Sequence, residues 1–446
     1  MRSGILPGMR PRRGFLTWLV VLAVVGFAGR LVWIFAATKG LSGFGDDFYY
    51  HAGAILLADG KGYVDPFKAA FSHQYVPAAD HPPLYLTYLA LPSWLGAQSY
   101  RAHQIATALL GTATIVVVGL LVRRMIGERA GLIAAALVML YPGFWIRDAR
   151  VLSESLAVLL TAVTLLLAYR FRDRPTVLGA TLLGGAVGLA ALARSELLLL
   201  SVLLVAPLLL LAKVPWRRKV AMILAAGGCA AVLVGPWAGY NETRFTHPVL
   251  LSTQLGATLA YANCDATYYG SNIGSWAFNC ATTIPGDGSV NDKNERRLAR
   301  AYIKAHLSRL PLVVAAREGR TWWVYAPRQT LQQNTDPDEH AAANAWLISY
   351  FVLLVLAIPG ALALRKRGVV IFPLMTVLLS VCISVATTFG TAKYRSPAEV
   401  VLVVLAAAAI DQGWSAVRRR RTNVPDEDVP QEQVSEGEPA VVRPAE

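Results

Sequence analysis

Long apolar runs alternate with short polar connections along most of this chain. Ten of these runs have about the length that crosses a bilayer as a helix. They lie at roughly 14–37, 103–122, 130–146, 151–169, 176–193, 197–212, 220–239, 346–364, 368–389 and 397–415. The pattern therefore predicts an all-α polytopic membrane protein with about ten transmembrane helices.

Two longer polar segments interrupt this alternation, at 38–102 and 240–345. In the second, Asn241–Asp292 is rich in Gly, Asn, Thr and Tyr, which favours irregular or short-strand structure. Glu295–Arg320 instead has the apolar spacing of a helix. We expect 240–345 to form a small α/β or irregular segment between the seventh and eighth helices.

Two aromatic stretches border these polar segments. His81–Gly96 is apolar but short and rich in proline, which favours a helix lying at the membrane interface. Aromatic residues also mark the return to the bilayer after 240–345, where we expect an aromatic belt. They are Trp322, Trp323, Tyr325 and Trp346.

Basic residues collect in alternate connections. Half of the 42 lysines and arginines lie near the two ends of the chain and in four short connections, around 123–129, 170–174, 213–219 and 365–367. By the positive-inside rule these segments and both termini are cytoplasmic. The segments 38–102 and 240–345 then lie outside the cytoplasm.

The expected organisation follows from this topology. We predict a cytoplasmic basic N-terminus (1–13), a transmembrane core (14–239) whose first outer loop (38–102) carries the chemistry, an extracytoplasmic domain (240–345) and C-terminal transmembrane helices (346–415). The remaining segment, 416–446, ends in an acidic, proline-rich stretch, which predicts a disordered tail.

Composition agrees with a membrane protein. The 446 residues are 55% hydrophobic and only 16% charged, with a mean hydropathy of +0.45. The net charge of +14 follows the cytoplasmic connections, which argues against nucleic-acid binding. No cleavage site follows the first apolar run, so we expect that run to be a span. Of four cysteines, Cys264 and Cys280 lie in a polar segment and could form a disulfide in an oxidising compartment.

Two adjacent carboxylates, Asp46 and Asp47, follow the first apolar run. Burial near lipid and mutual repulsion are expected to raise the pKa of at least one of them. A carboxylate with a raised pKa is suited to act as a general base. The alternative is an acidic loop that is simply solvated.

The short outer connections carry charges where small polar residues would suffice. Candidate phosphate ligands are Arg150, Arg194, Lys393 and Arg395. If the fourth span begins near Arg150, Glu154 lies one helical turn away on the same face. We expect these charges to line one cavity with Asp46 and Asp47. The alternative for each loop is an ion pair between helix ends.

The residue types favour a lipid-linked phosphate substrate. No nucleotide-binding fingerprint is present, and cations near the headgroups would stabilise a polyprenyl phosphate leaving group. A carboxylate would take the proton from the acceptor hydroxyl as it attacks the anomeric carbon. His81 and Glu154 would orient the phosphate ligands, and Tyr50 would stack on a sugar. No cofactor is required, although Asp46, Asp47 and Glu154 leave a divalent metal open.

Several stretches carry a family resemblance. GDDFYYHAGAILLADGKGY, HPPLY, RDARVLSES and KYRSPAE resemble the multi-span C-type (GT-C) glycosyltransferases, and especially family 39 and its bacterial relatives. These relatives include protein O-mannosyltransferases, aminoarabinose transferases and Rgt-type sugar transferases. The resemblance implies Asp46 as catalytic base, with Asp47 where the family commonly has Glu. It also matches His81 to the HPP-like segment, and Tyr394 and Arg395 to a late Tyr-Arg motif.

These observations predict a glycosyltransferase that moves one sugar from a polyprenyl-phosphate donor, with inversion. The acceptor is a glycan, lipid or protein, although no lectin-type domain is found. A flippase for lipid-linked sugar and a glycan ligase or polymerase using a lipid pyrophosphate remain alternatives. Abundant arginine and alanine suggest a GC-rich bacterial genome, and therefore a bacterial plasma membrane.

Overall fold

The computed structural model describes residues 12–38, 45–335 and 340–422. These residues form helices and loops without a β-strand, and one isolated bridge joins Val64 to Pro77. Most of the predicted basic N-terminus and of the predicted disordered tail lies outside the described residues.

Six helices are long and apolar enough to cross a membrane. They are α1 (Arg13–Ala37), α5 (Tyr100–Met125), α8 (Glu154–Asp173), α11 (Trp216–Glu242), α17 (His340–Lys366) and α19 (Ser396–Thr422). A seventh candidate span is the pair α6 (Glu128–Leu140) and α7 (Pro142–Asp148), bent by 53°. The prediction of a helical fold is confirmed for the described residues, and these candidate spans are compatible with a multi-pass membrane protein.

The other three predicted spans coincide with shorter apolar helices. These are α9 (Val177–Ala193), the helical stretch Ser195–Leu210, and α18 (Phe372–Thr387). Ser195–Leu210 changes type along its length, from the 3-10 turn η1 (Ser195–Leu198) through the π turn η2 (Ser201–Val205) to α10 (Ala206–Leu210). The number of ten spans therefore stays a prediction.

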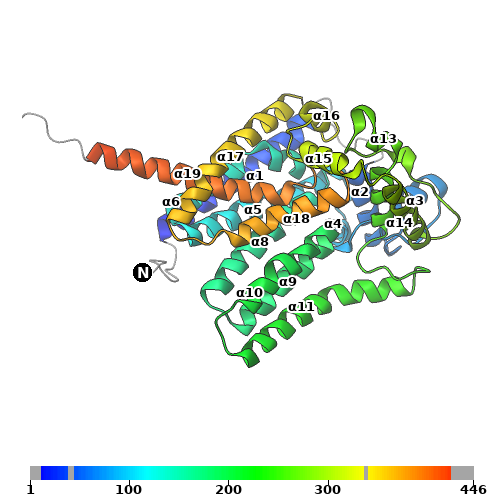
Figure 1. The fold of residues 1–446 in the computed structure, drawn as a ribbon, viewed down its shortest axis with the longest axis horizontal. Coiled ribbons are helices and arrows are strands. Elements are labelled where there is room, and N and C mark those ends of the chain that lie inside the picture. Colours follow the sequence, from blue (N-terminus) through cyan, green and yellow to red (C-terminus); the bar gives the residue numbers. More distant parts are fainter. Residues whose placement is uncertain (1–11, 39–44, 336–339, 423–446) are drawn as a thin grey trace, which may run out of the picture.

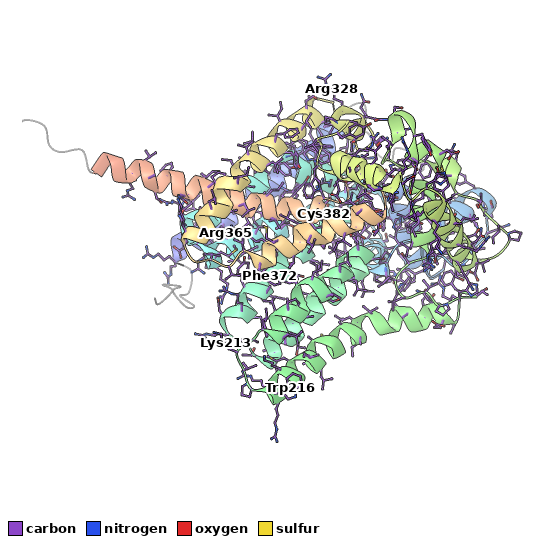
Figure 2. All side chains as sticks on the ribbon, in the orientation of Figure 1. Lys213, Trp216, Arg328, Arg365, Phe372 and Cys382 are labelled. Atoms are coloured by element: carbon purple, nitrogen blue, oxygen red, sulfur yellow. A yellow bond between two sulfur atoms is a disulfide. The ribbon has the colours of Figure 1, made fainter. Side chains whose placement is uncertain are left out.

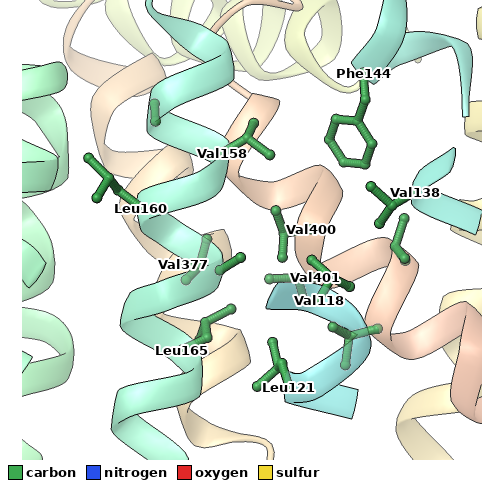
Figure 3. Packing of buried hydrophobic residues seen from close by; sticks show 14 of the residues in the cluster. Val118, Leu121, Val138, Phe144, Val158, Leu160, Leu165, Val377, Val400 and Val401 are labelled. Carbon is green, nitrogen blue, oxygen red and sulfur yellow. The ribbon is translucent and has the colours of Figure 1, made fainter. Parts of the chain in front are cut away.

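Helix α19 lies at the centre of the bundle. Between Ala398 and Ala408 every apolar side chain is at most 3% exposed. Figure 3 shows Val400 and Val401 beside Val118 of α5. On another side, α17 approaches closely because Gly360 has no side chain, and a Cβ there would lie 1.9 Å from the Leu405 carbonyl oxygen. Small residues that let backbones meet in this way are typical of membrane helix pairs.

Helices α9, α10 and α11 form a lobe beside this bundle (Figure 1). Only 17% of the apolar window of α11 is buried, and that helix packs mainly along α9. An apolar helix with so much exposed surface fits a lipid environment. Lys213, in the turn before α11, and Arg365, near the end of α17, both lie away from the end that holds α14 (Figure 2).

The remaining helices gather at the other end, which we call the α2 end (Figure 1). They are α2 (Asp46–Ala58), α3 (Pro66–Ser72), α4 (Pro83–Trp94), α12 (Gln254–Ala262), α13 (Asp265–Tyr268), α14 (Gly288–Ala305), α15 (Leu310–Thr321) and α16 (Pro327–Gln332). Helix α4 occupies the stretch predicted to be an interfacial helix. Residues 240–335 contain no strand, so the α/β alternative is wrong for this segment, which consists of helices α12 to α16 joined by irregular loops, and its position outside the cytoplasm stays a prediction.

Two predictions in this segment need correction. Glu295–Arg320 forms two helices, α14 and α15, interrupted at 306–309. The predicted aromatic belt is also wrong for Trp323 and Trp346, which are each 1% exposed and pack on one another at 5.0 Å between ring centroids. They are drawn inward because their ring faces enclose the guanidinium of Arg395.

Candidate functional site

The two adjacent carboxylates open helix α2. Gly45 precedes the helix in an extended conformation, and Asp46 and Asp47 fill the first turn, where the helix dipole favours negative charge. Tyr50 and Gly53 face inward, and a Cβ on Gly53 would lie 2.8 Å from a methyl group of Leu86 on α4. The close packing of α2 on α4 therefore fixes where Asp46 and Asp47 project.

Asp46 meets two side chains from distant parts of the chain. Its Oδ2 accepts a hydrogen bond from Lys393 Nζ at 3.0 Å, and its Oδ1 lies 3.7 Å from His81 Nε2. Lys393 comes from the loop between α18 and α19, and His81 immediately precedes Pro82 and α4. The side chains of Asp46, Lys393 and His81 are 39%, 34% and 24% exposed. A ligand can therefore reach this group, whereas Asp47 is buried at 4%.

The expected raised pKa is not found at Asp46. The charge of Lys393 is the main reason that the pKa of the Asp46 carboxyl lies well below its usual range, and His81 and Arg194 add to this effect while burial opposes it. Burial opposes the charge on Lys393, yet the carboxylates of Asp46 and Glu154 raise the pKa of its ammonium group. Repulsion between Asp46 and Asp47 can be inferred from the sequence, whereas the approach of Lys393 to Asp46 cannot.

A second charged group lies next to the first. Arg194 Nη1 is 2.8 Å from Glu154 Oε1, and Arg194 Nε donates to Glu196 Oε1 at 2.5 Å. The same guanidinium lies over the ring of Tyr394, 5.5 Å from its centroid. Because the charge of Arg194 acts on Asp46 and that of Glu154 on Lys393, the two groups share one electrostatic environment.

Tyr50 lies under this assembly. Its side chain is buried, with ring centroids 5.0 Å from His81 and 4.8 Å from Tyr85. The structure thus brings Asp46, Tyr50, His81, Glu154, Arg194, Lys393 and Tyr394 into one region, as the sequence predicted. With Tyr50 enclosed in this way, its ring supports His81, and little of it is presented to a sugar.

Arg150 is placed differently from the prediction. Helix α8 begins only at Glu154, so Arg150 lies in the turn after α7 and does not share a helical face with Glu154. Its Nη1 donates to the carbonyl oxygen of Asn334 at 3.1 Å. Its charge still acts on Lys393, so Arg150 stays near the site.

Arg395 has no exposed surface and is surrounded by protein groups. Its Nε donates to Glu399 Oε1 at 2.9 Å and its Nη1 to the Thr321 carbonyl at 2.8 Å. The guanidinium carbon lies 3.5 Å from the ring centroid of Trp323 and 3.9 Å from that of Tyr350. In this arrangement Arg395 anchors the loop that carries Lys393, and a ligand phosphate has no access to it.

Sequence reasoning missed two buried ion pairs that border the site. Arg147 binds Glu399 with two hydrogen bonds of 2.6 and 3.2 Å, and Arg30 Nε donates to Asp148 Oδ2 at 2.7 Å. Arg30 lies in the middle of the first apolar run, and a charge within a predicted span is itself a signal of a polar partner. These pairs hold α1, α7 and α19 together behind the site.

The sequence also left a divalent metal open at Asp46, Asp47 and Glu154, and it suggested a disulfide between Cys264 and Cys280. Within the described residues, no group of three or more His, Cys, Asp or Glu side chains is arranged to hold a metal ion. A divalent metal therefore stays a prediction. Cys264 and Cys280 are joined by a disulfide, which closes the loop that contains α13.

Comparisons with known proteins agree with this architecture. The family described as dolichyl-phosphate-mannose-protein mannosyltransferase matches residues 80–240, which is less than half of the chain. No curated protein matches the sequence significantly.

Several solved structures are similar. The oligosaccharyltransferase of Archaeoglobus fulgidus tethered to an acceptor peptide has a TM-score of 0.54 at 14% identity, over 92% of this chain and 51% of its own. The same organism's AglB, with an inhibitory peptide and a dolichol-phosphate, has a TM-score of 0.52 at 13% identity, over 92% and 51%. ArnT from Cupriavidus metallidurans bound to undecaprenyl phosphate has a TM-score of 0.41 at 15% identity, over 92% and 80%. This chain thus spans about half the length of the archaeal proteins.

Proposed function

We propose that the chain is a membrane glycosyltransferase of the C-type (GT-C) superfamily, which the family match over residues 80–240 and the similarity in fold to an archaeal oligosaccharyltransferase support. It moves a single sugar from a polyprenyl-phosphate donor to an acceptor hydroxyl on the extracytoplasmic face. The observation that carries this proposal is the accessible pair of Asp46 and Lys393, 3.0 Å apart. A proton acceptor and a phosphate-binding cation are thereby present at one accessible place, and an inverting displacement at a phosphorylated sugar uses both, on opposite faces of the sugar ring.

Asp46 acts as the general base. Its Oδ1 accepts the proton of the acceptor hydroxyl while the hydroxyl oxygen bonds to the anomeric carbon. The bond from that carbon to the phosphate oxygen breaks on the opposite face, so the configuration inverts. His81, 3.7 Å from Asp46, holds the carboxylate in orientation.

Lys393 couples the base to the donor. In the free protein it holds the pKa of the Asp46 carboxyl low, which makes the carboxylate a weak base. The donor phosphate draws the ammonium group away from Asp46, so the pKa of Asp46 rises as the donor binds. The base thus becomes stronger when its substrate is in place, and Lys393 stabilises the leaving phosphate.

Arginines complete the donor site. Arg194, now paired with Glu154 and Glu196, and Arg150, near Lys393, are the further phosphate ligands. Arg395 is a positioning residue in this proposal, because it contacts only protein groups around the Lys393 loop. The acceptor is a glycan, lipid or protein, and the membrane is a bacterial plasma membrane with both termini in the cytoplasm.

A second candidate is transfer of a whole glycan from a lipid pyrophosphate. The similarity in fold to an archaeal oligosaccharyltransferase favours it. The two candidates differ in the donor consumed, so one assay separates them. A flippase would bind the same lipids and leave every donor intact.

The test uses purified protein in lipid nanodiscs with radiolabelled polyprenyl-phosphate sugars and polyprenyl-pyrophosphate glycans. We expect wild type to consume a monophosphate donor and Asp46→Asn to lose about 10²–10⁴-fold in kcat, the usual contribution of a general base. Asp47→Asn is the matched variant, because it removes the neighbouring buried carboxylate. Retained activity in Asp46→Asn with loss in Asp47→Asn would move the base to Asp47, and intact donors throughout would contradict the enzyme proposal.

A further inference from the structure

A line of aromatic rings leads away from the candidate site. Tyr394 lies 5.3 Å from Phe389 between ring centroids, Phe389 lies 6.4 Å from Trp276, and Trp276 lies 4.4 Å from Phe278. Tyr261 follows at 5.2 Å from Phe278. We call these five residues the aromatic path. Its inner end contacts Arg194 through Tyr394, and its outer end lies beside the Cys264–Cys280 disulfide.

One ring of the path is exposed and the other four are partly buried, with Tyr394 packed against a small apolar cluster of Val381, Val385 and Ala398. Phe278 has 66% of its surface exposed, and the other four side chains are partly exposed. Large aromatic side chains usually bury their faces, and they are left accessible mainly where they bind something. None of the five rings belongs to the large apolar core of the helix bundle.

The surface that carries the rings is firmly held. The Gly390 amide donates to the Gly274 carbonyl at 2.8 Å, which joins the Phe389 loop to the Trp276 loop. Beneath them Arg320, which is 0% exposed, donates to the carbonyl oxygens of Ile273 and Ser271, both at 2.6 Å. Helix α15, which carries Arg320, packs on α18 next to the bundle (Figure 1). Because this surface is rigid, its aromatic rings lose little conformational freedom when a ligand binds to them.

The polar groups beside the exposed ring of Phe278 are neutral amides, while charged groups lie at the two ends of the path, with Arg194 at Tyr394 and Glu295 near Tyr261. Asn279 is exposed next to Phe278, and Gln329 of α16 donates a hydrogen bond to Asn272 Oδ1 on the same loop as Phe278, at 2.8 Å. Aromatic faces attract C–H groups that carry partial positive charge, while amides donate to and accept from hydroxyls. A sugar chain offers both, because each ring has C–H faces and a rim of hydroxyl groups. A lipid tail would leave the amides unused, and a phosphate would be bound at the inner end of the path, where Arg194 contacts Tyr394.

We propose that the aromatic path binds a carbohydrate acceptor of several sugar units, whose terminal hydroxyl reaches Asp46. This inference rests on the proposed function for the direction of binding, because it assumes that an acceptor enters at Tyr394. It names the acceptor class as a glycan chain. Each additional sugar unit stacks on a ring farther from the site, so affinity rises with the length of the acceptor.

The first measurement is equilibrium dialysis of labelled linear glucan, mannan and arabinan oligosaccharides of one to five units against the purified full-length protein. It needs no donor, so it tests the path even if no transfer occurs. We expect Kd for one of the three sugar classes to fall with length, and Phe278→Ala to raise Kd for the five-unit chain about tenfold, the loss of one good stacking contact.

Variants at one position distinguish stacking from folding. Phe278→Trp retains a ring and should bind like wild type, while Phe278→Leu retains apolar bulk without a ring face and should behave like Phe278→Ala. Tyr269→Ala is the matched control, because Tyr269 is an exposed aromatic residue on the same loop whose ring lies under Arg309 and off the path. It should leave binding unchanged.

With an active donor, the ratio of kcat/KM for five-unit over one-unit acceptors should fall about tenfold in Phe278→Ala. The proposal is overturned if no oligosaccharide binds better with length. It is also overturned if Phe278→Ala weakens binding of polyprenyl phosphate or of peptides and not of sugars. Failure of all donors to react, with length-dependent sugar binding intact, would contradict the proposed function and leave this inference standing.

Discussion

At the scale of single residues, the proposed mechanism assigns phosphate binding to Lys393 and proton transfer to Asp46, which are in contact. The two side chains are each about a third exposed, so each can exchange its partner for a substrate group. Asp46 also shows where sequence reasoning ends. The Asp pair can be seen in the sequence as a candidate base, but the direction of its pKa depends on Lys393, whose approach only the fold determines.

The acid strength of Asp46 provides a pH test. The acid limb of kcat/KM reports the base in the free enzyme, where Lys393 lowers the pKa of Asp46, and the limb of kcat reports the donor complex. Because the pKa of Asp46 is proposed to rise when the donor binds, we expect the acid limb of kcat to lie at higher pH than the acid limb of kcat/KM. Lys393→Gln removes the lowering charge, so the pKa of Asp46 rises and the kcat/KM limb moves to higher pH. Lys61→Gln, an exposed lysine nearby in the sequence, is the control, and an unmoved limb in Lys393→Gln would contradict the coupling.

The buried charges behind the site predict a large effect on stability. Glu399 has no exposed surface and binds both Arg147 and Arg395. Glu399→Gln leaves two buried guanidinium groups without their counter-charge, and we expect a loss of about 3–5 kcal/mol. Asp173→Asn breaks the pair with Arg124, in which the two side chains are 25% and 28% exposed, and should cost no more than about 1 kcal/mol. Thermal unfolding in detergent compares the two, and equal shifts would mean that the buried pair contributes no more than the surface pair.

At the scale of elements, the apolar runs predicted the positions of the helices well. They predicted the breaks within the helices less well. All ten runs coincide with helical segments, because the requirement to satisfy backbone groups in lipid leaves little choice. Local breaks were less predictable. The 53° bend lies at Pro142, which begins α7 and lacks a backbone N–H to continue α6, and a hydropathy pattern does not record this. The π turn at Ser201–Val205 is likewise absent from the hydropathy pattern.

Charged loops were predicted to meet, and seven of the named side chains do. The exceptions have physical causes. Arg395 is drawn into an aromatic enclosure that no spacing rule indicates, because Trp323 and Tyr350 come from other elements. Arg150 leaves the helical face because α8 begins at Glu154.

Close helix packing gives a prediction at this scale. Gly360→Ala forces α17 away from the Leu405 carbonyl of α19, and we expect it to cost about 1–3 kcal/mol of stability. Gly235→Ala, in α11, meets nothing within 4 Å and should be neutral or slightly stabilising, since alanine favours a helix. Thermal unfolding in detergent measures both. A neutral Gly360→Ala would show that the two helices can separate freely.

At the scale of the whole molecule, the disulfide supports the α2 end. Cys264 and Cys280 are 16 positions apart, and closing a loop of this size is worth about 3 kcal/mol. We expect the double variant Cys264→Ser, Cys280→Ser to open residues 260–290 to protease while the helix bundle stays intact. Reductant should have the same effect on wild type and none on the variant. Equal protease resistance in all four samples would contradict this role.

The pair of Asp46 and Lys393 also has a consequence for biosynthesis. Its members are 347 positions apart, and Lys393 lies in the loop just before the last helix. The ribosome therefore synthesises Asp46, the proposed base, long before Lys393, the proposed phosphate-binding cation. The nascent protein lacks the proposed donor site until α18 and α19 have entered the membrane. If the proposed function holds, an incompletely inserted polypeptide is unable to consume the lipid donor, and activity begins only when assembly in the bilayer is complete.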